Sequence, residues 1–209
     1  MKATYALMLA IFCTGIDMYV VAALIPTMAA DLNESVASLA LLVSAYALPA
    51  ALLAPFFGPL SDRFGRRLVM VSGMAFFAVT VAGTAVAPSL EVLVVLRVLN
   101  GLGAAVAMPA MFAYAGDLPT VTQRSRAMSN LAMAFPLASL LGLPLGALLA
   151  GTVNWRATFA AVALLALLAT FLIWRLPADR AKGCLLYTSP SPRDARKYRV
   201  CRLLLEKGG

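Results

Sequence analysis

The chain has 209 residues, of which 62% are hydrophobic and 12% are charged, with a formal net charge of +8. A soluble globular domain is about 45–50% apolar and about 25% charged. This composition excludes an ordinary soluble domain and indicates a membrane protein.

Six apolar segments follow one another in residues 1–176, and each is close to the length of about 20 residues that a helix needs to cross a bilayer. The expected spans are 5–29, 37–57, 68–87, 91–115, 128–150 and 155–175. Helices satisfy their own backbone hydrogen bonds in lipid, and the alternating ten-residue pattern of a membrane β-barrel is missing from the sequence. The sequence therefore predicts an all-α membrane protein with six transmembrane helices.

Positive charge gathers in alternate loops. The loops at 62–67, 122–127 and 175–182 contain Arg63, Arg66, Arg67, Arg124, Arg126, Arg175, Arg180 and Lys182, and Lys2 lies on the same side. The opposite loops, near 30–36, 88–91 and 151–156, contain Arg156 as their one basic residue. The positive-inside rule therefore places both ends of the six-span unit, including the N-terminus, in the cytoplasm.

Asp17 lies near the middle of the first expected span, roughly 16–18 Å from either end at about 1.5 Å per residue. A charge at that depth costs at least about 2.5–3.5 kcal/mol on insertion scales. Removal from water also disfavours the charged form of a carboxylate, which makes reversible protonation accessible. We predict a proton or cation site in a central cavity. The alternative is a carboxylate that only bonds a neighbouring helix.

Residues 58–68 read Gly-Pro-Leu-Ser-Asp-Arg-Phe-Gly-Arg-Arg-Leu, between the second and third spans. We call six of these residues the latch motif: Gly58, Asp62, Arg63, Gly65, Arg66 and Arg67. Asp62 can accept hydrogen bonds from arginine or from helix-end amides, and both glycines allow close approach or a positive φ. The string resembles the loop between spans 2 and 3 of the major facilitator superfamily. That resemblance implies a loop that holds the two halves of a transporter together on the cytoplasmic face; a plain positive-inside loop is the alternative.

Arg97 is the other deeply placed ionisable residue, about two turns from the outer end of the fourth span. Its long side chain can reach toward the level of Asp17, where a cation favours the charged carboxylate. The stretch 96–103, which includes Asn100, resembles the span-4 motif of the same family, an arginine followed by a glycine-rich turn. The resemblance links that arginine to proton transfer. We predict that Asp17, Arg97 and Asn100 form a proton-coupling and substrate cavity; the alternative is an Arg97 that reaches the outer surface.

The fifth span has a stripe of small residues four positions apart, which allows a neighbouring helix to approach closely. We call it the small-residue stripe: Ala138, Gly142, Gly146 and Ala150. Together with Pro144 it resembles the span-5 motif of drug/proton antiporters, with the proline displaced by one position. The form Gly-x-Pro-x-Gly at 142–146 is closer to sugar-efflux-like members. Simple close packing is the alternative.

The end of the chain differs from the spans in composition and periodicity. Residues 177–183 are expected to begin a cytoplasmic central loop. Cys184–Asp194 can be encoded by a transposon-end sequencing adapter, and Val200–Leu205 by the outer end of that adapter in the same frame. We expect 184–209 to be an unstructured translated artefact; a natural basic tail is the alternative.

Residues 1–183 carry 11 Lys and Arg against 7 Asp and Glu, a net charge of +4. The basic balance is therefore no sign of nucleic-acid binding. One cysteine, Cys13, remains in this part, and the sequence has no histidine, so neither a disulfide framework nor a metal site is expected. No nucleotide-binding loop or nucleophile–base set appears, so we predict no enzyme and no cofactor, with a proton gradient as the energy source.

The resemblance implies the N-terminal half of a twelve-span major facilitator transporter in a bacterial inner membrane. Ala23–Met28 is faintly similar to Ala107–Met111, as expected for two inverted three-helix repeats. The implied function is proton-coupled efflux of a small molecule or drug by alternating access, with a missing six-span half as partner. One alternative is a symporter or facilitator of a sugar, purine or amino acid. Another is a non-transporting or dimerising half-size protein, which predicts a stop codon soon after Gly183.

Overall fold

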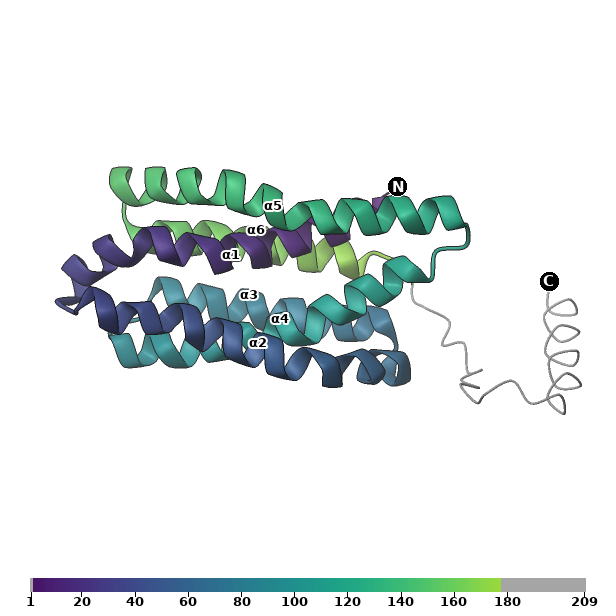
Figure 1. Ribbon diagram of the computed structural model, residues 1–209, viewed down its shortest axis with the longest axis horizontal. Helices are drawn as coiled ribbons and strands as arrows, with labels where there is room; N and C mark the ends of the chain where they lie inside the picture. The colour runs from purple at the N-terminus through teal and green to yellow at the C-terminus, as the bar shows by residue number, and fades with distance from the viewer. Residues whose placement is uncertain (1, 178–209) are drawn as a thin grey trace, which may run out of the picture.

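The computed structural model describes residues 2–177, and within them the chain forms six long helices (Figure 1). Their bounds are α1 (Lys2–Leu32), α2 (Val36–Phe64), α3 (Arg66–Ala85), α4 (Leu90–Gly116), α5 (Val121–Thr152) and α6 (Trp155–Trp174). Each is long and apolar enough to cross a membrane. The predicted all-α membrane fold with six spans is confirmed. The expected loop at 177–183, apart from Pro177, and the expected artefact at 184–209 lie outside the described residues.

Four helices begin directly after a polar capping residue, and α5 thereby begins at Val121, ahead of the span predicted over 128–150. Helix α2 extends at its other end, to Phe64, beyond the span predicted over 37–57. The side-chain oxygens of Ser35, Ser89 and Thr120 accept hydrogen bonds from backbone N–H groups three residues later, at the starts of α2, α4 and α5. Asn154 caps α6 in the same manner through the N–H of Arg156. Such caps satisfy N–H groups that have no partner inside the helix. The polar first turns of α5 are therefore helical although they are not apolar.

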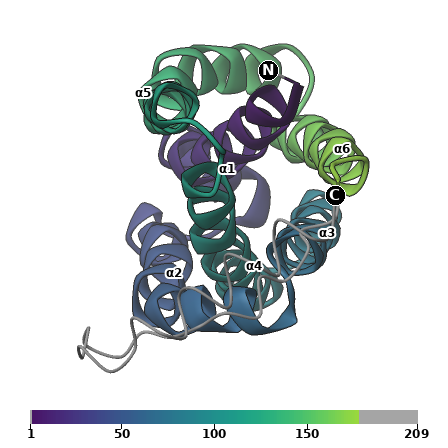
Figure 2. The same ribbon diagram turned by 90° about the vertical axis from the view of Figure 1, so that its right-hand side faces the viewer.

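The helices pack in two groups, and each group combines one helix from one three-helix repeat with two from the other, where the repeats are α1–α3 and α4–α6. Helix α1 packs against α5 and α6, whereas α4 packs against α2 and α3. The groups meet where α3 contacts α6 and α1 contacts α2, and viewed from the end α1 and α4 lie towards the middle (Figure 2). Helices α1 and α4 begin at opposite ends of the bundle (Figure 1). This is the arrangement expected of two inverted repeats.

Gly101 is where α4 comes close to the backbone of α2. A Cβ atom at this position would lie 2.3 Å from the carbonyl oxygen of Tyr46 and 3.4 Å from the nitrogen of Ala50. We expect Gly101→Ala to destabilise the chain by about 1–3 kcal/mol, because a backbone carbonyl cannot move aside without shifting the helix. Thermal unfolding of the purified chain in detergent measures this.

Gly151→Ala is the matched control for Gly101→Ala. Gly151 also lies in a helix, but nothing is within 4 Å of the position that its Cβ would take. Alanine there is expected to leave stability unchanged or slightly higher. An equal decrease in both variants would contradict the close approach of α4 to α2.

Candidate functional site

A buried ion pair lies between α1 and α4. Nη1 of Arg97 is 2.8 Å from Oδ2 of Asp17, and the two side chains are 1% and 0% exposed. The same nitrogen also donates to the backbone carbonyl of Asp17, at 3.2 Å. The structure therefore brings together the two deep ionisable residues named from the sequence, and it leaves Arg97 in the core and not at the outer surface.

Phe159 of α6 covers a second side of Arg97. The Cζ atom of Arg97 lies 4.9 Å from the centre of the Phe159 ring, which is itself fully buried. An aromatic face attracts a guanidinium through its quadrupole, and the attraction is larger away from water. Arg97 is thus held by α1 through charge and by α6 through a ring. Sequence reasoning missed Phe159, since an isolated phenylalanine in an apolar span gives no signal.

Asn100 lies one helical turn after Arg97 on α4 and is fully buried. Within the described residues, both polar atoms of its amide have no hydrogen-bond partner, and the same holds for Oδ1 of Asp17 and for Nε and Nη2 of Arg97. Each buried polar atom without a partner costs about 1–3 kcal/mol. The three predicted residues therefore offer both donors and acceptors that the fold itself does not use.

The small-residue stripe packs against α1 around the level of Asp17. A Cβ on Gly142 would lie 3.1 Å from the Ile16 side chain, and a Cβ on Gly146 would overlap Val20. On α1, a Cβ on Gly15 would lie 2.7 Å from the Cβ of Ala138. Close approach of α1 and α5 is thus the structural result of the stripe. Pro144 is exposed on another face of α5, and Ala150 is only partly buried.

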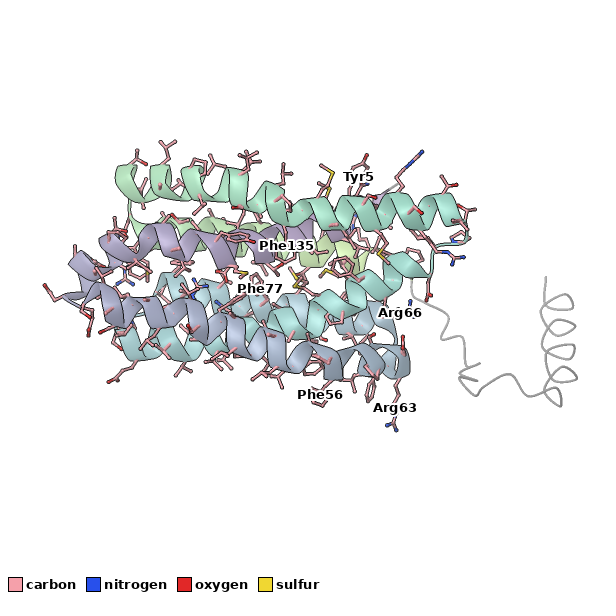
Figure 3. All side chains as sticks on the ribbon, viewed as in Figure 1. Tyr5, Phe56, Arg63, Arg66, Phe77 and Phe135 are labelled. Carbon is pink, nitrogen blue, oxygen red and sulfur yellow. The ribbon has the colours of Figure 1, made fainter. Side chains whose placement is uncertain are left out.

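The latch motif forms a charge cluster at one end of the bundle. Asp62 accepts from Nε and Nη2 of Arg66 at 3.2 and 3.0 Å. Arg66 also donates to the carbonyl of Ala113 and pairs with Asp117, so it links α2 and α3 to the end of α4. In Figure 3, Arg66 lies beside that end of α4. Sequence reasoning missed Asp117, and its position just after the fourth span was the available signal.

The other four residues of the latch motif differ in their positions and contacts. Gly65, at φ +92°, makes the turn between α2 and α3, a conformation that favours glycine. Gly58 differs from the expectation: it lies inside α2, and no atom is within 4 Å of its Cβ position. Arg67 donates to the carbonyl of Trp174 at the end of α6. Arg63 points away from the bundle, over the Phe64 ring (Figure 3).

A second polar cluster, not predicted as a site, ties three helices at the opposite end. Nε1 of Trp155 donates to Asp31 at 2.9 Å, which joins the start of α6 to the end of α1. Arg156 donates to the carbonyl of Ala87 at 2.6 Å, just after α3. Arg156 is the single basic residue in the loops at this end, and it is paired with Asp31, so the excess of positive charge remains at the other end of the bundle.

Comparison with known proteins gives one family. The model of the Major Facilitator Superfamily matches residues 7–197, a range that continues past the described residues. Multidrug resistance protein 1 of Bacillus subtilis is 32% identical over 155 residues, which cover 73% of this chain and 40% of that protein. The chloramphenicol resistance protein of Streptomyces lividans is 31% identical over 202 residues, covering 96% of this chain and 52% of that protein.

Among solved structures, the inward-open xylose transporter XylE from E. coli superposes with a TM-score of 0.73 at 20% identity. The alignment covers 98% of this chain and 56% of that transporter. At this identity the likeness concerns the fold alone. The chain spans about half, or less, of the length of the relatives that it matches.

Proposed function

Because the chain belongs to the Major Facilitator Superfamily, whose members transport solutes across membranes and are not enzymes, we propose that it forms the first half of a proton-coupled exporter. The exported compound is a small molecule or drug, and the missing partner is a second six-span half. The observation that carries the proposal is the buried pair of Asp17 and Arg97 between α1 and α4.

The pair can couple protonation to movement because each charge stabilises the other in a dry environment. When Asp17 takes a proton from the outer side, it becomes neutral and its attraction to Arg97 is lost. A buried cation without its anion is costly, so the protonated state favours an arrangement in which Arg97 gains another partner. Phe159 limits how far Arg97 moves, because the ring still attracts the guanidinium.

The unused donors and acceptors of Asn100, Asp17 and Arg97 give a substrate a place to bind at the same site. A polar substrate group that bonds Asp17 or Arg97 competes with their mutual contact. Substrate and proton then favour different states of one pair, which is the thermodynamic requirement for exchange. Export by alternating access follows if the proton binds from outside and leaves to the cytoplasm.

The second half is proposed to pack beside α2 and α5. Of the most apolar 18-residue stretch of each helix, 17% is buried inside the described structure in α2 and 28% in α5, against 39–56% in the other four helices. Both lie on one side of the bundle, opposite α3 and α6 (Figure 2). The latch motif at the arginine-rich end is proposed to face the cytoplasm of a bacterial inner membrane. Within it, Asp62 at the end of α2, paired with Arg66, is proposed to hold the two halves together, whereas Arg67 lies on the side of α6.

The experiment is a proton-exchange assay on the whole transporter in everted membrane vesicles. Respiration acidifies the vesicle lumen, and an acridine dye reports the pH difference. An antiporter raises the luminal pH when its substrate is added, because substrate enters as protons leave. Chloramphenicol and a cationic dye are suitable first compounds, since relatives are named chloramphenicol and multidrug resistance proteins.

The outcomes of this assay separate the possible functions. Substrate uptake accompanied by a rise in luminal pH supports the proposed exporter. Uptake that further acidifies the lumen indicates a symporter, and uptake without a pH change indicates a facilitator. Full activity of residues 1–183 expressed without a second half would contradict the two-half arrangement and support a dimerising half-size protein.

A further inference from the structure

A groove of about 460 Å³ opens between the first turns of α3 and the last turn of α6. It is separate from the Asp17–Arg97 site and lies at the arginine-rich end of the bundle. Most of its wall is apolar or aromatic, and Arg67 is the charged residue that lines it. Phe64, Leu68 and Trp174 line it with more than half of their surface exposed.

Arg67 crosses this groove from α3 to α6. One of its nitrogens, Nη2, donates to the backbone carbonyl of Trp174, which fixes the guanidinium in place. An arginine side chain has five N–H donors, so most remain available. Among the residues that the structure describes, no carboxylate pairs with Arg67, because Asp62 and Asp117 both pair with Arg66.

The surroundings of the groove add positive charge. Arg63 lies over the Phe64 ring and Arg175 over the Phe171 ring, and neither has a carboxylate partner within the described part of the chain. The first turn of α3 has no side-chain cap, so its N–H groups also face this end of the helix. An anion is therefore favoured here by Arg67, with Arg63 and Arg175 as more distant contributions.

We propose that this groove binds an anionic phospholipid, with the phosphate on Arg67 and an acyl chain along Leu68 and Val71. Both chemical features of the occupant follow from the groove: a fixed cation at the level of the headgroups and an exposed apolar wall that continues into the membrane span. Tryptophan and arginine at the end of a span are typical of the membrane interface, and basic pockets between helices bind anionic headgroups.

The bilayer reaches the groove in the whole transporter if the second half covers α2 and α5, since α3 and α6 lie on the other side (Figure 2). The inference can be tested on the chain itself and needs no transport. Failure of the lipid site would leave the proposed exporter intact, and absence of proton exchange would leave the lipid site intact.

Trp174 provides the readout, because bromine atoms on a lipid acyl chain quench a tryptophan that they contact. The other tryptophan, Trp155, is 2% exposed and lies at the opposite end of α6, about 30 Å away. The chain is reconstituted in phosphatidylcholine vesicles that contain a fixed minor fraction of brominated phosphatidylglycerol or brominated phosphatidylcholine. Trp174→Phe gives the contribution of Trp155, which is subtracted.

We expect brominated phosphatidylglycerol to occupy the site about fivefold more than brominated phosphatidylcholine, the enrichment expected for one arginine at the surface. Arg67→Gln should remove this preference, and Arg67→Lys should retain part of it. Arg126→Gln is the matched control: it removes the same charge at the same end of the bundle but outside the groove.

The proposal is overturned if the wild-type chain shows no preference between the two lipids. It is equally overturned if Arg126→Gln lowers the preference as much as Arg67→Gln, since the cause would then be general surface charge. If Arg67→Gln fails to fold, the proposal is tested by measuring the lipid preference of Arg67→Lys and of the wild type at increasing salt concentration. A preference insensitive to salt in both would contradict an electrostatic site.

Discussion

Replacing Asp17 with Asn in the whole transporter should reduce proton-driven export to the level of vesicles without transporter. Asparagine keeps the size of the side chain and can still accept a hydrogen bond from Arg97, but it cannot carry a proton in exchange for substrate. The measurement is accumulation of substrate in everted vesicles under an imposed pH gradient, together with the change in luminal pH. Binding of substrate, measured separately by equilibrium dialysis, should persist.

Glu34→Gln is the control for Asp17→Asn. It neutralises a carboxylate in the loop just after α1, where the side chain is exposed, so export should remain near the wild-type value. Undiminished proton-driven export in Asp17→Asn would contradict the role proposed for Asp17. Loss of substrate binding together with export would instead assign Asp17 to substrate contact alone.

Replacing Arg97 with Gln should destabilise the chain by about 3–5 kcal/mol, because it leaves the Asp17 carboxylate buried without its cation. Glutamine supplies hydrogen-bond donors but no charge, and it cannot reproduce the contact with the Phe159 ring. Thermal or denaturant unfolding of the purified chain in detergent gives the difference in stability between variant and wild type.

The double variant Asp17→Asn/Arg97→Gln separates the charge effect from lost packing. With both charges removed, no buried ion lacks a partner, and most of the stability should return. The double-mutant cycle should then give a large interaction energy, which means that the charges of Asp17 and Arg97 stabilise each other. If the double variant is as unstable as the sum of the two single variants, the pair contributes through packing and the coupling mechanism loses its basis.

The pair and the small-residue stripe act together on the position of Asp17. Gly142 and Gly146 bring α5 close to α1, and Arg97 approaches the same part of α1 from α4. A movement that separates α1 from α4 therefore has to be accommodated at a tightly packed contact with α5. In the proposed alternating access, the stripe would therefore act through packing against α1.

Composition and hydrophobic periodicity were sufficient to predict the number and type of the helices. An apolar segment that crosses a bilayer must be helical, so six such segments determine six helices without knowledge of their neighbours. The latch motif predicted a turn between the second and third spans, with Gly58 and Gly65 as its glycines. The structure has the turn at Gly65, where φ is positive, and places Gly58 inside α2. Helix ends were less accurate, because α2 and α5 continue through polar residues to caps that hydropathy does not detect.

The sequence by itself determined the kind of protein: a membrane-embedded chain with one acid and one arginine deep in its spans, and a stripe of small residues on the fifth. Only the tertiary structure decided which of these groups meet. The contact of Asp17 with Arg97 joins residues 80 positions apart. The Phe159 ring on Arg97, the bond of Arg66 to Asp117 and the groove beside Arg67 depend equally on how the helices pack. Helix formation in lipid is a local consequence of hydrogen bonding, whereas side-chain pairing depends on helix rotation and crossing, which arise from contacts among all the helices together.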